Sequence, residues 1–531
     1  MPPLARESAL EIIDWLIVAA YFAFTIWFGS YFAKRQTSSE RYFLGDRKLP
    51  GWAVGMSIFA TIISSWAFLA LPGKSFKDDM QYLLTIAPIP LTVLIAVLFL
   101  IPVFRQKIRV SAYEYLERRF GLLARFYGNI VFISGHFFKM GMVLYLLCLA
   151  IEGATGWAGT YLTYLIIIVG VITIFYTFFG GIEGVVWTHV IQGFLLLGGG
   201  LIGLLFLLFS SKAGPNEMLA TAYNSGKFKL TNFDFDWNGL SVYMLLCFGF
   251  THYLARYTTD QTVVQRYLLA RSTKQASRSL WVSVFFLGLV WVLFMTVGAL
   301  LWVFYKLEPE LLPEAVRQKP DQVFAYFIGH QIPAGVTGLI LAGVFAAAMS
   351  TLSSDLNSLA SVLADDFYEK LAKAPTDSRR LLFSRISVVV AGVGAIFLAI
   401  ALRRVKSMVE VFFVFSSIMA GGMIGMFFLG LLTKRCSRKG LYVGLVIGVA
   451  FIMWATLTNE NYIKSSPLAG LLTWLPAWLP KYKIHIYWLG LLGNIVVFVV
   501  GYLASRIFTP GHRAESGLTI YGKSLPSVSE A

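Results

Sequence analysis

Charged residues are scarce in this chain: Asp, Glu, Lys and Arg together make up 14% of its 531 residues. Water-soluble globular proteins carry roughly 25%, so the composition excludes an ordinary soluble enzyme. Cysteine is scarce too, and Cys148, Cys247 and Cys436 form neither a disulfide framework nor a zinc pattern. The sequence also lacks a nucleophile elbow, a phosphate-binding loop and an HExxH segment. Nothing specific therefore favours an integral-membrane enzyme.

Apolar residues, in contrast, are abundant: they make up 57% of the chain, and its mean hydropathy is +0.70. One water-soluble core cannot hide that much apolar surface, so the composition predicts a multispanning membrane protein in contact with a lipid bilayer. The 44 Lys and Arg residues outnumber the 28 Asp and Glu residues, which gives a net charge of +16. In a membrane protein such an excess usually marks cytoplasmic loops. We therefore expect no nucleic-acid partner.

Thirteen apolar segments are each long enough to cross a hydrocarbon core of roughly 30 Å as a helix. The first is too long for the apolar region of a signal peptide and lacks a clear cleavage site, so we expect it to remain as a helix. The predicted spans are 12–32, 50–72, 81–104, 123–151, 158–179, 184–210, 239–257, 279–305, 332–364, 384–402, 408–432, 440–457 and 484–507.

The distribution of basic residues predicts the orientation. If the N-terminus is outside, the inner loops and the C-terminal tail hold more than half of the 44 Lys and Arg residues. The loops assigned to the outside mix fewer basic residues with acidic ones. This is a positive-inside pattern, and it predicts a multi-pass protein of the cell (inner) membrane with its N-terminus outside and its C-terminus in the cytoplasm.

Counting spans also suggests an internal symmetry. Spans two to six and seven to eleven form two groups of five, and an odd number of spans inverts the second group relative to the first. Inverted repeats of this kind are one architecture of secondary transporters. The predicted organisation is an extra N-terminal transmembrane helix (1–33), a first five-helix repeat (50–210), an inverted second repeat (239–432), two C-terminal transmembrane helices (440–507) and a cytoplasmic tail (508–531).

Two spans contain clusters of small hydroxyl-bearing residues. Thr61, Ser64 and Ser65 lie in the middle of the second span, where a helix could unwind and expose carbonyl groups. In the ninth span Ala347, Ser350 and Thr351 have i, i+3, i+4 spacing and share one helix face. Neutral oxygens suit a hard monovalent cation, and carboxylates are too few for a dedicated calcium site. The alternative is that these small residues only allow close helix packing.

Ionisable side chains within spans are costly and point to functional sites. Lys139 lies near the middle of the fourth span, and His136, His189 and His252 also lie within spans. Lys139 could face the substrate and favour an anionic solute, or it could be buried against a carboxylate or backbone carbonyls. A lone histidine is more often a packing residue than a proton carrier.

Five segments, in register along residues 10 to 440, resemble the sodium/solute symporters, the family of sodium/glucose cotransporters and bacterial sialic acid transporters. The resemblance implies an all-α membrane protein with a LeuT-like inverted five-helix repeat and about 13 transmembrane helices. It implies sodium-coupled symport of a sugar, a sialic acid or another carboxylate by alternating access. The segments are Tyr42–Trp52, Ser111–Phe120, Gly180–Gln192, Thr259–Arg266 and Ala346–Ser358.

The resemblance also implies ligands. Sodium, the coupling ion, would bind the carbonyls of Ala60, Ile63 and Ala347 and the hydroxyls of Ser350 and Thr351. The residues implied to line the substrate pocket are Ser64, Trp66, Tyr82, Ile86 and Lys139.

This pocket departs from several relatives. Sugar-transporting members have an acidic residue where Ile86 stands, a Gln early in the tenth repeat helix where 411–415 is apolar, and an aromatic gate residue where Arg256 stands. Sialic acid members have a Gln at the first position and an Arg at Lys139. We expect the segment Thr259–Arg266 to be structural.

A second ion site is altered in this chain. Members that use two sodium ions have an Asp where this sequence has His189, while the accompanying Ser353 and Ser354 are retained. Imidazole is a poor ligand for sodium, so we expect one coupled sodium per cycle and a vestigial second site. If His189 displaced the ion, His189→Asp should add a second sodium dependence; the alternative is that His189 only packs or hydrogen-bonds near the cytoplasmic exit. The alternatives are proton coupling through the buried histidines, or a sensor or channel on the same scaffold. A monomer is compatible with the sequence, which does not define the oligomeric state.

Overall fold

The computed structural model describes residues 10–108, 110–157, 159–372, 376–404, 422–459, 484–509 and 517–521. Throughout these residues the regular structure is helical, apart from an isolated bridge between Leu49 and Ala270. The expectation of an all-α protein is therefore confirmed. The apolar segment 411–415, most of the predicted span 408–432 and most of the predicted tail lie outside the described residues.

Nine helical segments of the described chain are long and apolar enough to cross a membrane, and a bent pair of helices makes a tenth. The nine are Ile12–Arg35, Gln81–Lys107, Leu122–Thr155 (which is α8), Thr160–Ser210 (α9), Thr273–Leu307 (α13), Val336–Leu371, Asp377–Arg403, Arg438–Leu457 (α21) and Tyr487–Phe508 (α23). The bent pair is α3 (Gly51–Ile62) and α4 (Ser65–Lys77). The multi-pass membrane architecture is confirmed, while the total of thirteen spans stays a prediction.

Helix α9 explains part of the difference in number. It is 51 residues long and contains both predicted spans 158–179 and 184–210. Its backbone is not helical at Gly181, where φ is +53°. Gln36 and Tyr42 approach this glycine so closely that a Cβ atom would lie under 3.0 Å from each. Glycine alone fits both the left-handed backbone and the tight contact, so the chain turns here between two membrane-length helices.

Helices α3 and α4 meet at an angle of 62°, as the sequence predicted for a broken span. Ile63 ends α3 in an extended conformation. Ser64 then caps α4, where its side chain accepts a hydrogen bond from the backbone N–H of Trp66. A serine at an N-cap satisfies one of the unpaired N–H groups of the new helix. The break leaves carbonyl groups of α3 without helical partners, deep in the bundle.

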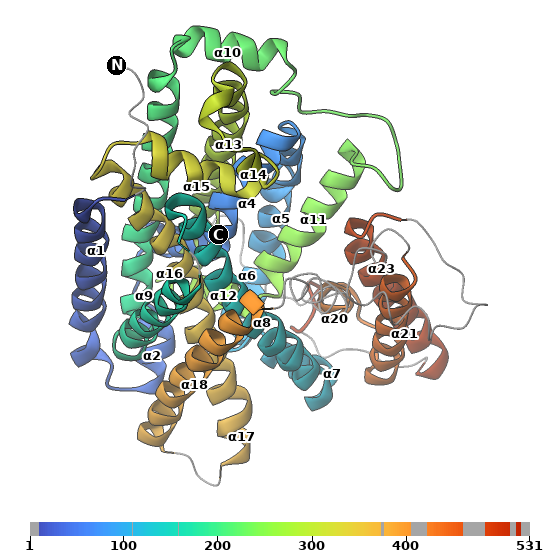
Figure 1. The fold of residues 1–531 in the computed structure, drawn as a ribbon. Coiled ribbons are helices and arrows are strands. Elements are labelled where there is room, and N and C mark those ends of the chain that lie inside the picture. Colours follow the sequence, from blue (N-terminus) through green and yellow to red (C-terminus); the bar gives the residue numbers. More distant parts are fainter. Residues whose placement is uncertain are drawn as a thin grey trace.

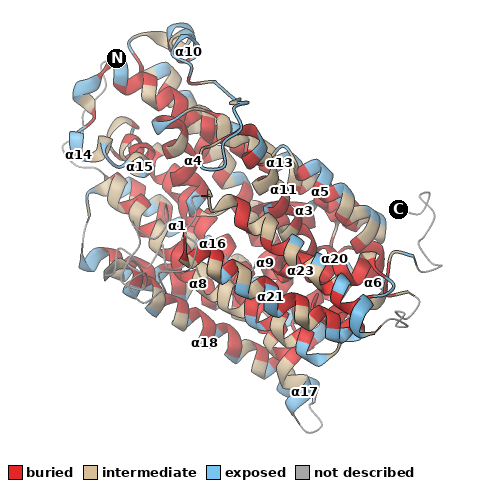
Figure 2. Cartoon of the chain, turned by 90° about the vertical axis from the view of Figure 1, so that its right-hand side faces the viewer, coloured by how far each residue is buried: buried red, intermediate tan, exposed pale blue. Residues whose placement is uncertain are grey.

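The remaining helices surround this break. Helix α16 (Val336–Val362) packs along α9 and touches α3, α4 and α8, and nearly all of its residues are buried (Figure 2). Helix α1 (Ile12–Tyr31) lies on one side of the bundle, and α20 (Met423–Leu432), α21 and α23 lie on the other (Figure 1). Two elements connect these parts: α11 (Val242–Thr258), which contacts α23, and the short α12 (Gln261–Leu268), which packs against α3, α13 and α16.

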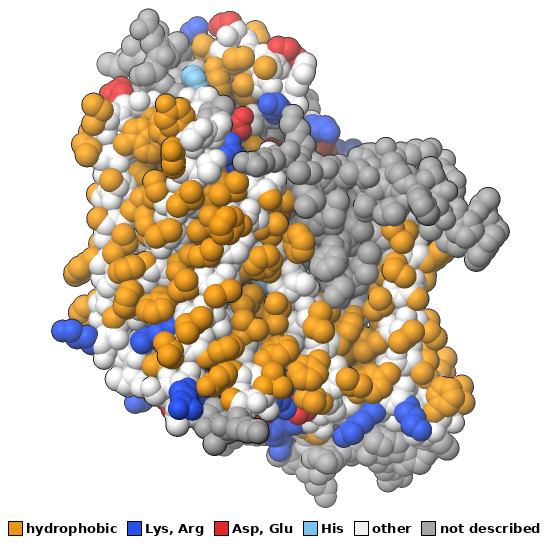
Figure 3. Space-filling view, turned by 60° about the horizontal axis from the view of Figure 1, so that its bottom comes forward, with side chains coloured by type: hydrophobic (Ala, Val, Ile, Leu, Met, Phe, Trp, Pro, Cys, Tyr) orange, Lys and Arg blue, Asp and Glu red, His pale blue; other side chains and the backbone are white. Residues whose placement is uncertain are grey.

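The outer surface agrees with a lipid environment. Figure 3 shows a broad face covered by apolar side chains, with Lys and Arg side chains at its upper and lower ends. Exposed aromatic and aliphatic residues of this kind would be unfavourable in water over so large an area. The face therefore fits contact with hydrocarbon.

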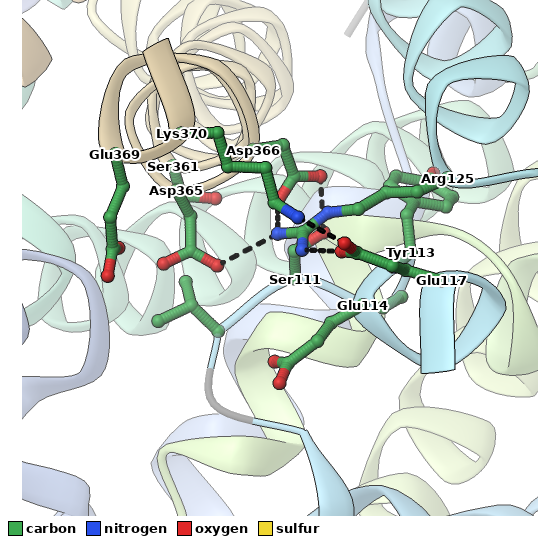
Figure 4. A network of polar contacts seen from close by, with 12 residues as sticks. Ser111, Tyr113, Glu114, Glu117, Arg125, Ser361, Asp365, Asp366, Glu369 and Lys370 are labelled. Atoms are coloured by element: carbon green, nitrogen blue, oxygen red, sulfur yellow. Dashed lines mark hydrogen bonds and ion pairs between the residues drawn. The ribbon is translucent and has the colours of Figure 1, made fainter. Parts of the chain in front are cut away.

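A dense polar cluster joins three helices at the end of the bundle where α7 (Glu114–Phe120) lies (Figure 4). The buried guanidinium of Arg125, on α8, pairs with Glu117 of α7 and with Asp365 and Asp366. The two aspartates lie in the π-helical continuation of α16, Leu363–Tyr368. Burial favours a raised pKa for Glu117, but hydrogen bonds from Lys370 and Arg125 outweigh it, and the pKa lies below its usual value. The cluster locks α7, α8 and the end of α16 together.

Candidate functional site

Five oxygen atoms converge where the break between α3 and α4 faces α16. The Ser350 hydroxyl donates to the carbonyl of Ala60 at 2.8 Å, and the Thr351 hydroxyl donates to the carbonyl of Ile63 at 3.1 Å. Both hydroxyls also reach the carbonyl of Ala347, at 3.1 and 3.3 Å. All five residues are almost completely buried. The structure therefore brings together the five residues predicted as sodium ligands.

The chemistry of this oxygen cluster suits an alkali cation. Its carbonyl and hydroxyl oxygens are neutral and hard, and unwound backbone of this kind coordinates sodium in secondary transporters. A hydroxyl that now donates to a carbonyl can rotate and offer its lone pairs to an ion instead. Binding a cation would thus replace hydrogen bonds between α3 and α16 with shared ion contacts and hold the two helices together.

The predicted second ion site contains nitrogen atoms instead of a carboxylate. His189 lies between two hydroxyls, with Nδ1 2.9 Å from Ser57 Oγ and Nε2 2.9 Å from Ser353 Oγ. The guanidinium of Arg266, which is completely buried, donates to Ser57 Oγ at 3.0 Å and to Ser354 Oγ at 2.7 Å. The serines predicted for this site are therefore already hydrogen-bonded to an imidazole and to a fixed cation.

The sequence analysis missed the role of Arg266, because the segment Thr259–Arg266 was interpreted as structural only. The segment forms the N-cap and most of α12, and every residue of α12 is buried. Its side chains reach α16 through polar contacts: Gln265 donates to Asn357 at 3.0 Å and accepts from Ser358 at 2.8 Å. The signal available in the sequence was a basic residue, Arg266, within an amphipathic eight-residue segment.

Lys139 is paired with a carboxylate, which is one of the two arrangements that the sequence leaves open. Its Nζ lies 3.1 Å from Oδ1 of Asp355, one turn along α16 from Thr351. Asp355 is completely buried and was not weighed in the sequence analysis, although a carboxylate within a span is itself a signal of function. The neutralising charge comes from α16, so Lys139 does not require a substrate anion to be stable in the bundle.

Of the other residues implied to line a substrate pocket, two lie at the break and two lie at the start of the next span. Ser64 is half-buried and Trp66 is 41% exposed at the start of α4. Tyr82 lies 4.7 Å beneath the ammonium of Lys74, and Ile86 follows it in the next span. The placement of these residues with Lys139 in one pocket stays a prediction. A cavity of 270 Å³ does occur, but it lies elsewhere, at the far end of α4, and is lined by Phe76, Trp302, Tyr305, Lys306, Pro309 and Arg317.

A broken membrane helix that offers carbonyls to a buried hydroxyl pair is typical of ion-coupled membrane transporters. Residues 42–448 match the model of the sodium:solute symporter family. The chain is 32% identical over 511 residues to the sodium/sialic acid symporter NanT of Aliivibrio fischeri, with 95% of each chain covered. The chain belongs to the sodium:solute symporter family. It is a sodium-coupled transporter of a small solute and not an enzyme.

Solved structures agree with this assignment. The fold matches the substrate-bound, outward-open state of a Na+-coupled sialic acid symporter with a TM-score of 0.82 and 30% identity, covering 95% of this chain and 99% of the other. It also matches Mhp1, a nucleobase-cation-symport-1 family transporter, with a TM-score of 0.51 and 16% identity, over 87% and 93% of the two chains. The second match supports the expected LeuT-like type of fold, and the first extends along nearly the whole chain.

Proposed function

We propose that this protein imports a carboxylate-bearing solute, a sialic acid or a related acidic sugar, together with one sodium ion by alternating access. The observation that carries the proposal is the set of five buried oxygens between the α3–α4 break and α16. Sodium bound there would hold α3 and α16 together and favour the state in which substrate enters. A ligand shifts such an equilibrium only by its difference in affinity between the two states.

The proposed substrate class is supported by similarity to the sialic acid symporters and by Lys139. The resemblance aligns Lys139 with an arginine of sialic acid transporters, so a cationic side chain is retained at this position. Asp355 neutralises Lys139 in the described state. A substrate carboxylate would therefore compete with Asp355 for the ammonium. This competition predicts weaker carboxylate binding than an unpaired cation would give.

The proposed topology follows the basic residues. We place the protein in the cell (inner) membrane with its N-terminus outside, two inverted five-helix repeats at 50–210 and 239–432, and thirteen spans in total. The end of the bundle with α7 and the Arg125 cluster is then cytoplasmic. In this orientation α12 lies on the cytoplasmic side of the proposed sodium site, and sodium and substrate leave past it.

Reconstitution tests the proposal directly. Purified protein in liposomes should accumulate a radiolabelled sialic acid when an inward sodium gradient is applied, and accumulation should stop when potassium replaces sodium. Empty liposomes and liposomes with Ser350→Ala/Thr351→Ala protein are the controls. Equal accumulation with and without a sodium gradient would contradict the proposed coupling. Sodium-dependent accumulation of glucose but not of sialic acid would contradict only the proposed substrate class.

A further inference from the structure

His136, on α8, lies between two carboxylates that come from different parts of the bundle. Its Nδ1 is 2.9 Å from Oδ1 of Asp355 on α16, and its Nε2 is 3.4 Å from Oδ1 of Asp260, the N-cap residue of α12. The side chains of His136, Asp355 and Asp260 are 11%, 0% and 9% exposed. The imidazole is thus the shared contact of two buried acidic groups.

A neutral imidazole cannot satisfy both contacts. One of its nitrogens carries a proton and the other presents a lone pair, whereas an ionised carboxylate only accepts hydrogen bonds. In either neutral tautomer a lone pair would therefore face a carboxylate oxygen at one of the two contacts. The imidazolium form carries a proton on both nitrogens, so it donates from Nδ1 to Asp355 and forms an ion pair with Asp260 through Nε2. The two contacts therefore favour one more proton on His136 than its neutral imidazole carries.

Placing the extra proton on Asp355 does not change this count. A proton on Oδ1 of Asp355 would be shared with His136 Nδ1, which is the same proton in another position. A proton on Oδ2 would have no acceptor, because this oxygen has no hydrogen-bond partner among the described residues. The proton therefore belongs to the contact between His136 and Asp355, with Nε2–H directed at Asp260.

Other charged groups surround the three residues without removing the need for this proton. On α8, Lys139 donates to the same Oδ1 of Asp355 at 3.1 Å. On α11, Arg256 pairs with Oδ2 of Asp260. With His136 protonated, these five side chains carry three positive and two negative charges, and the guanidinium of Arg266 on α12 is a further electrostatic neighbour of both aspartates. His252, also on α11, is an electrostatic neighbour of Lys139, Arg256 and Asp260, and the ring of Phe132 packs on His136 with centroids 4.2 Å apart.

We propose that His136 is a proton-binding site whose proton ties α12 to α8 and α16. Asp260 caps α12 through hydrogen bonds from the N–H and the hydroxyl of Thr262, so the carboxylate and the helix move together. Polar side chains also join α12 to α16: Gln265 donates to Asn357 and accepts from Ser358.

The consequence for transport rests on the proposed function, in which sodium and substrate leave past α12 on the cytoplasmic side. When α12 moves away, His136 loses the carboxylate of Asp260 and keeps only that of Asp355. One neutral tautomer then satisfies the remaining contact, and the second proton passes to water on the cytoplasmic side. Acid on that side therefore stabilises the docked position of α12, and alkali favours its release.

His189 provides an internal comparison for the test. Both of its partners are hydroxyls, those of Ser57 and Ser353. A hydroxyl can donate or accept, so a neutral His189 satisfies both contacts. We expect His136 to be doubly protonated and His189 to be singly protonated at the same pH. Nitrogen-15 NMR of histidine-labelled protein in lipid distinguishes the two forms, and His136→Gln and His189→Asn assign the signals.

At pH 7.5 the His136 ring should give the signal of an imidazolium, and this signal should be missing in His136→Gln and retained in His189→Asn. In Asp260→Asn the His136 ring should give the signal of a neutral imidazole at the same pH. This result would show that the two carboxylates together hold the proton, which a misfolded protein would not. A singly protonated His136 in the unmodified protein would overturn the proposal. This measurement needs no transport, so its result is independent of whether the proposed substrate is correct.

Movement of α12 is tested by thiol labelling. Asn357→Cys, in a background in which Cys148, Cys247 and Cys436 are replaced by Ser, places a thiol where α12 covers α16. For each protein we compare the rate of alkylation by a maleimide at pH 8.5 with the rate at pH 6.5. This ratio should be at least fivefold larger in this protein than in the same protein with His136→Gln. The variant corrects for the ionisation of the thiol itself. Equal pH dependence in both proteins would show that the His136 proton does not hold α12.

Discussion

The hydroxyl of Ser350 lies 2.8 Å from the carbonyl of Ala60, although the two residues are 290 positions apart in the sequence. This contact joins the end of α3, where the helix is about to break, to the centre of the most buried helix of the bundle. It explains why a broken helix is tolerated at this depth, since the exposed carbonyl is hydrogen-bonded within protein. The same contact predicts how sodium would couple the two helices.

Removing the hydroxyls of both Ser350 and Thr351 should abolish the coupling of uptake to sodium but not the folding of the protein. In Ser350→Ala/Thr351→Ala each lost hydrogen bond costs about 1 kcal/mol of folding free energy, so folded protein should still reach the membrane. Sodium-driven uptake in proteoliposomes should fall to the level of empty liposomes, because two of the five proposed ligands are gone. Unchanged sodium dependence in the double variant would show that the ion binds elsewhere. Ser361→Ala, on the same helix but far from the site, is the matched control.

We expect one sodium ion per transport cycle. His189 and the guanidinium of Arg266 occupy the contacts of Ser57, Ser353 and Ser354, and a buried cation repels a second one. The sodium dependence of uptake should therefore fit a Hill coefficient near one, and the reversal potential should require one ion per substrate. A Hill coefficient clearly above one would contradict this stoichiometry.

The structure changes the expected effect of His189→Asp. The sequence predicts a second sodium dependence in this variant if His189 displaced an ion, and none if His189 only packs or hydrogen-bonds. In the structure Arg266 shares Ser57 with His189, so a new carboxylate would pair with the guanidinium before it could bind sodium. We therefore expect the Hill coefficient of His189→Asp to stay near one. A value near two would show that Arg266 is displaced and that the second site can be restored.

A double-variant cycle can assign the role of Lys139. Lys139→Met leaves the carboxylate of Asp355 without its ammonium partner, and Asp355→Asn leaves the ammonium without its carboxylate. If Lys139 also binds the substrate carboxylate, the affinity for sialic acid should drop about tenfold or more in Lys139→Met, and the double variant should not recover it. Recovery of affinity in the double variant would show that Lys139 serves only to neutralise Asp355. Binding to detergent-solubilised protein, measured by calorimetry, provides the affinities.

Lys227, which lies outside the membrane spans, should make the stability of the protein depend on pH. Its ammonium lies at the C-terminal end of α4, where it donates to the carbonyls of Phe76 and Asp78 at 2.8 and 2.7 Å. Burial lowers the pKa of Lys227 to about 8, against about 10.4 in an unfolded chain. Between these values the unfolded chain binds the proton that the folded chain has lost, so this group raises the free energy of unfolding as pH increases.

The melting temperature of the unmodified protein relative to Lys227→Met should therefore rise between pH 7.5 and 9.5. Lys306→Met is the matched control, because it removes an exposed ammonium that lies over the same ring of Trp302. A difference that falls with increasing pH would contradict the assignment. Light-scattering melts of the detergent-solubilised proteins suffice for the comparison.

The Arg125 cluster should be the most sensitive polar contact for stability. Arg125→Ala leaves Asp366 buried without its guanidinium, while Asp365 keeps that of Arg380. Breaking a buried pair in this way costs about 3–5 kcal/mol. Arg118→Ala removes a half-exposed ion pair on the neighbouring α7 and should cost about 1 kcal/mol or less. Thermal unfolding should rank the two variants in this order. Similar melting temperatures would show that the cluster is not structurally critical.

Local sequence properties were sufficient to predict the membrane spans, the shared helix face of the proposed ligands and the position of the helix break. Composition and long apolar segments determined that the protein crosses a membrane many times. The helical spacing of Ala347, Ser350 and Thr351 determined that their oxygens share one face, because the period of an α-helix is independent of its surroundings. The small polar residues at 61–65 also indicated where a helix would break. These inferences depend on residues within a few positions of one another, which is the range over which sequence patterns are informative.

Only the tertiary structure decided which charges meet. Lys139 and Asp355 are 216 positions apart, and His136 and Asp260 come from helices that no local pattern brings together. The contact of Arg266 with Ser354 likewise depends on how α12 packs against α16. In a low-dielectric interior the energy of an ionisable group depends on the partner within a few ångströms. The protonation of His136, the pairing of Lys139 and the filling of the second ion site are therefore properties of the assembled bundle.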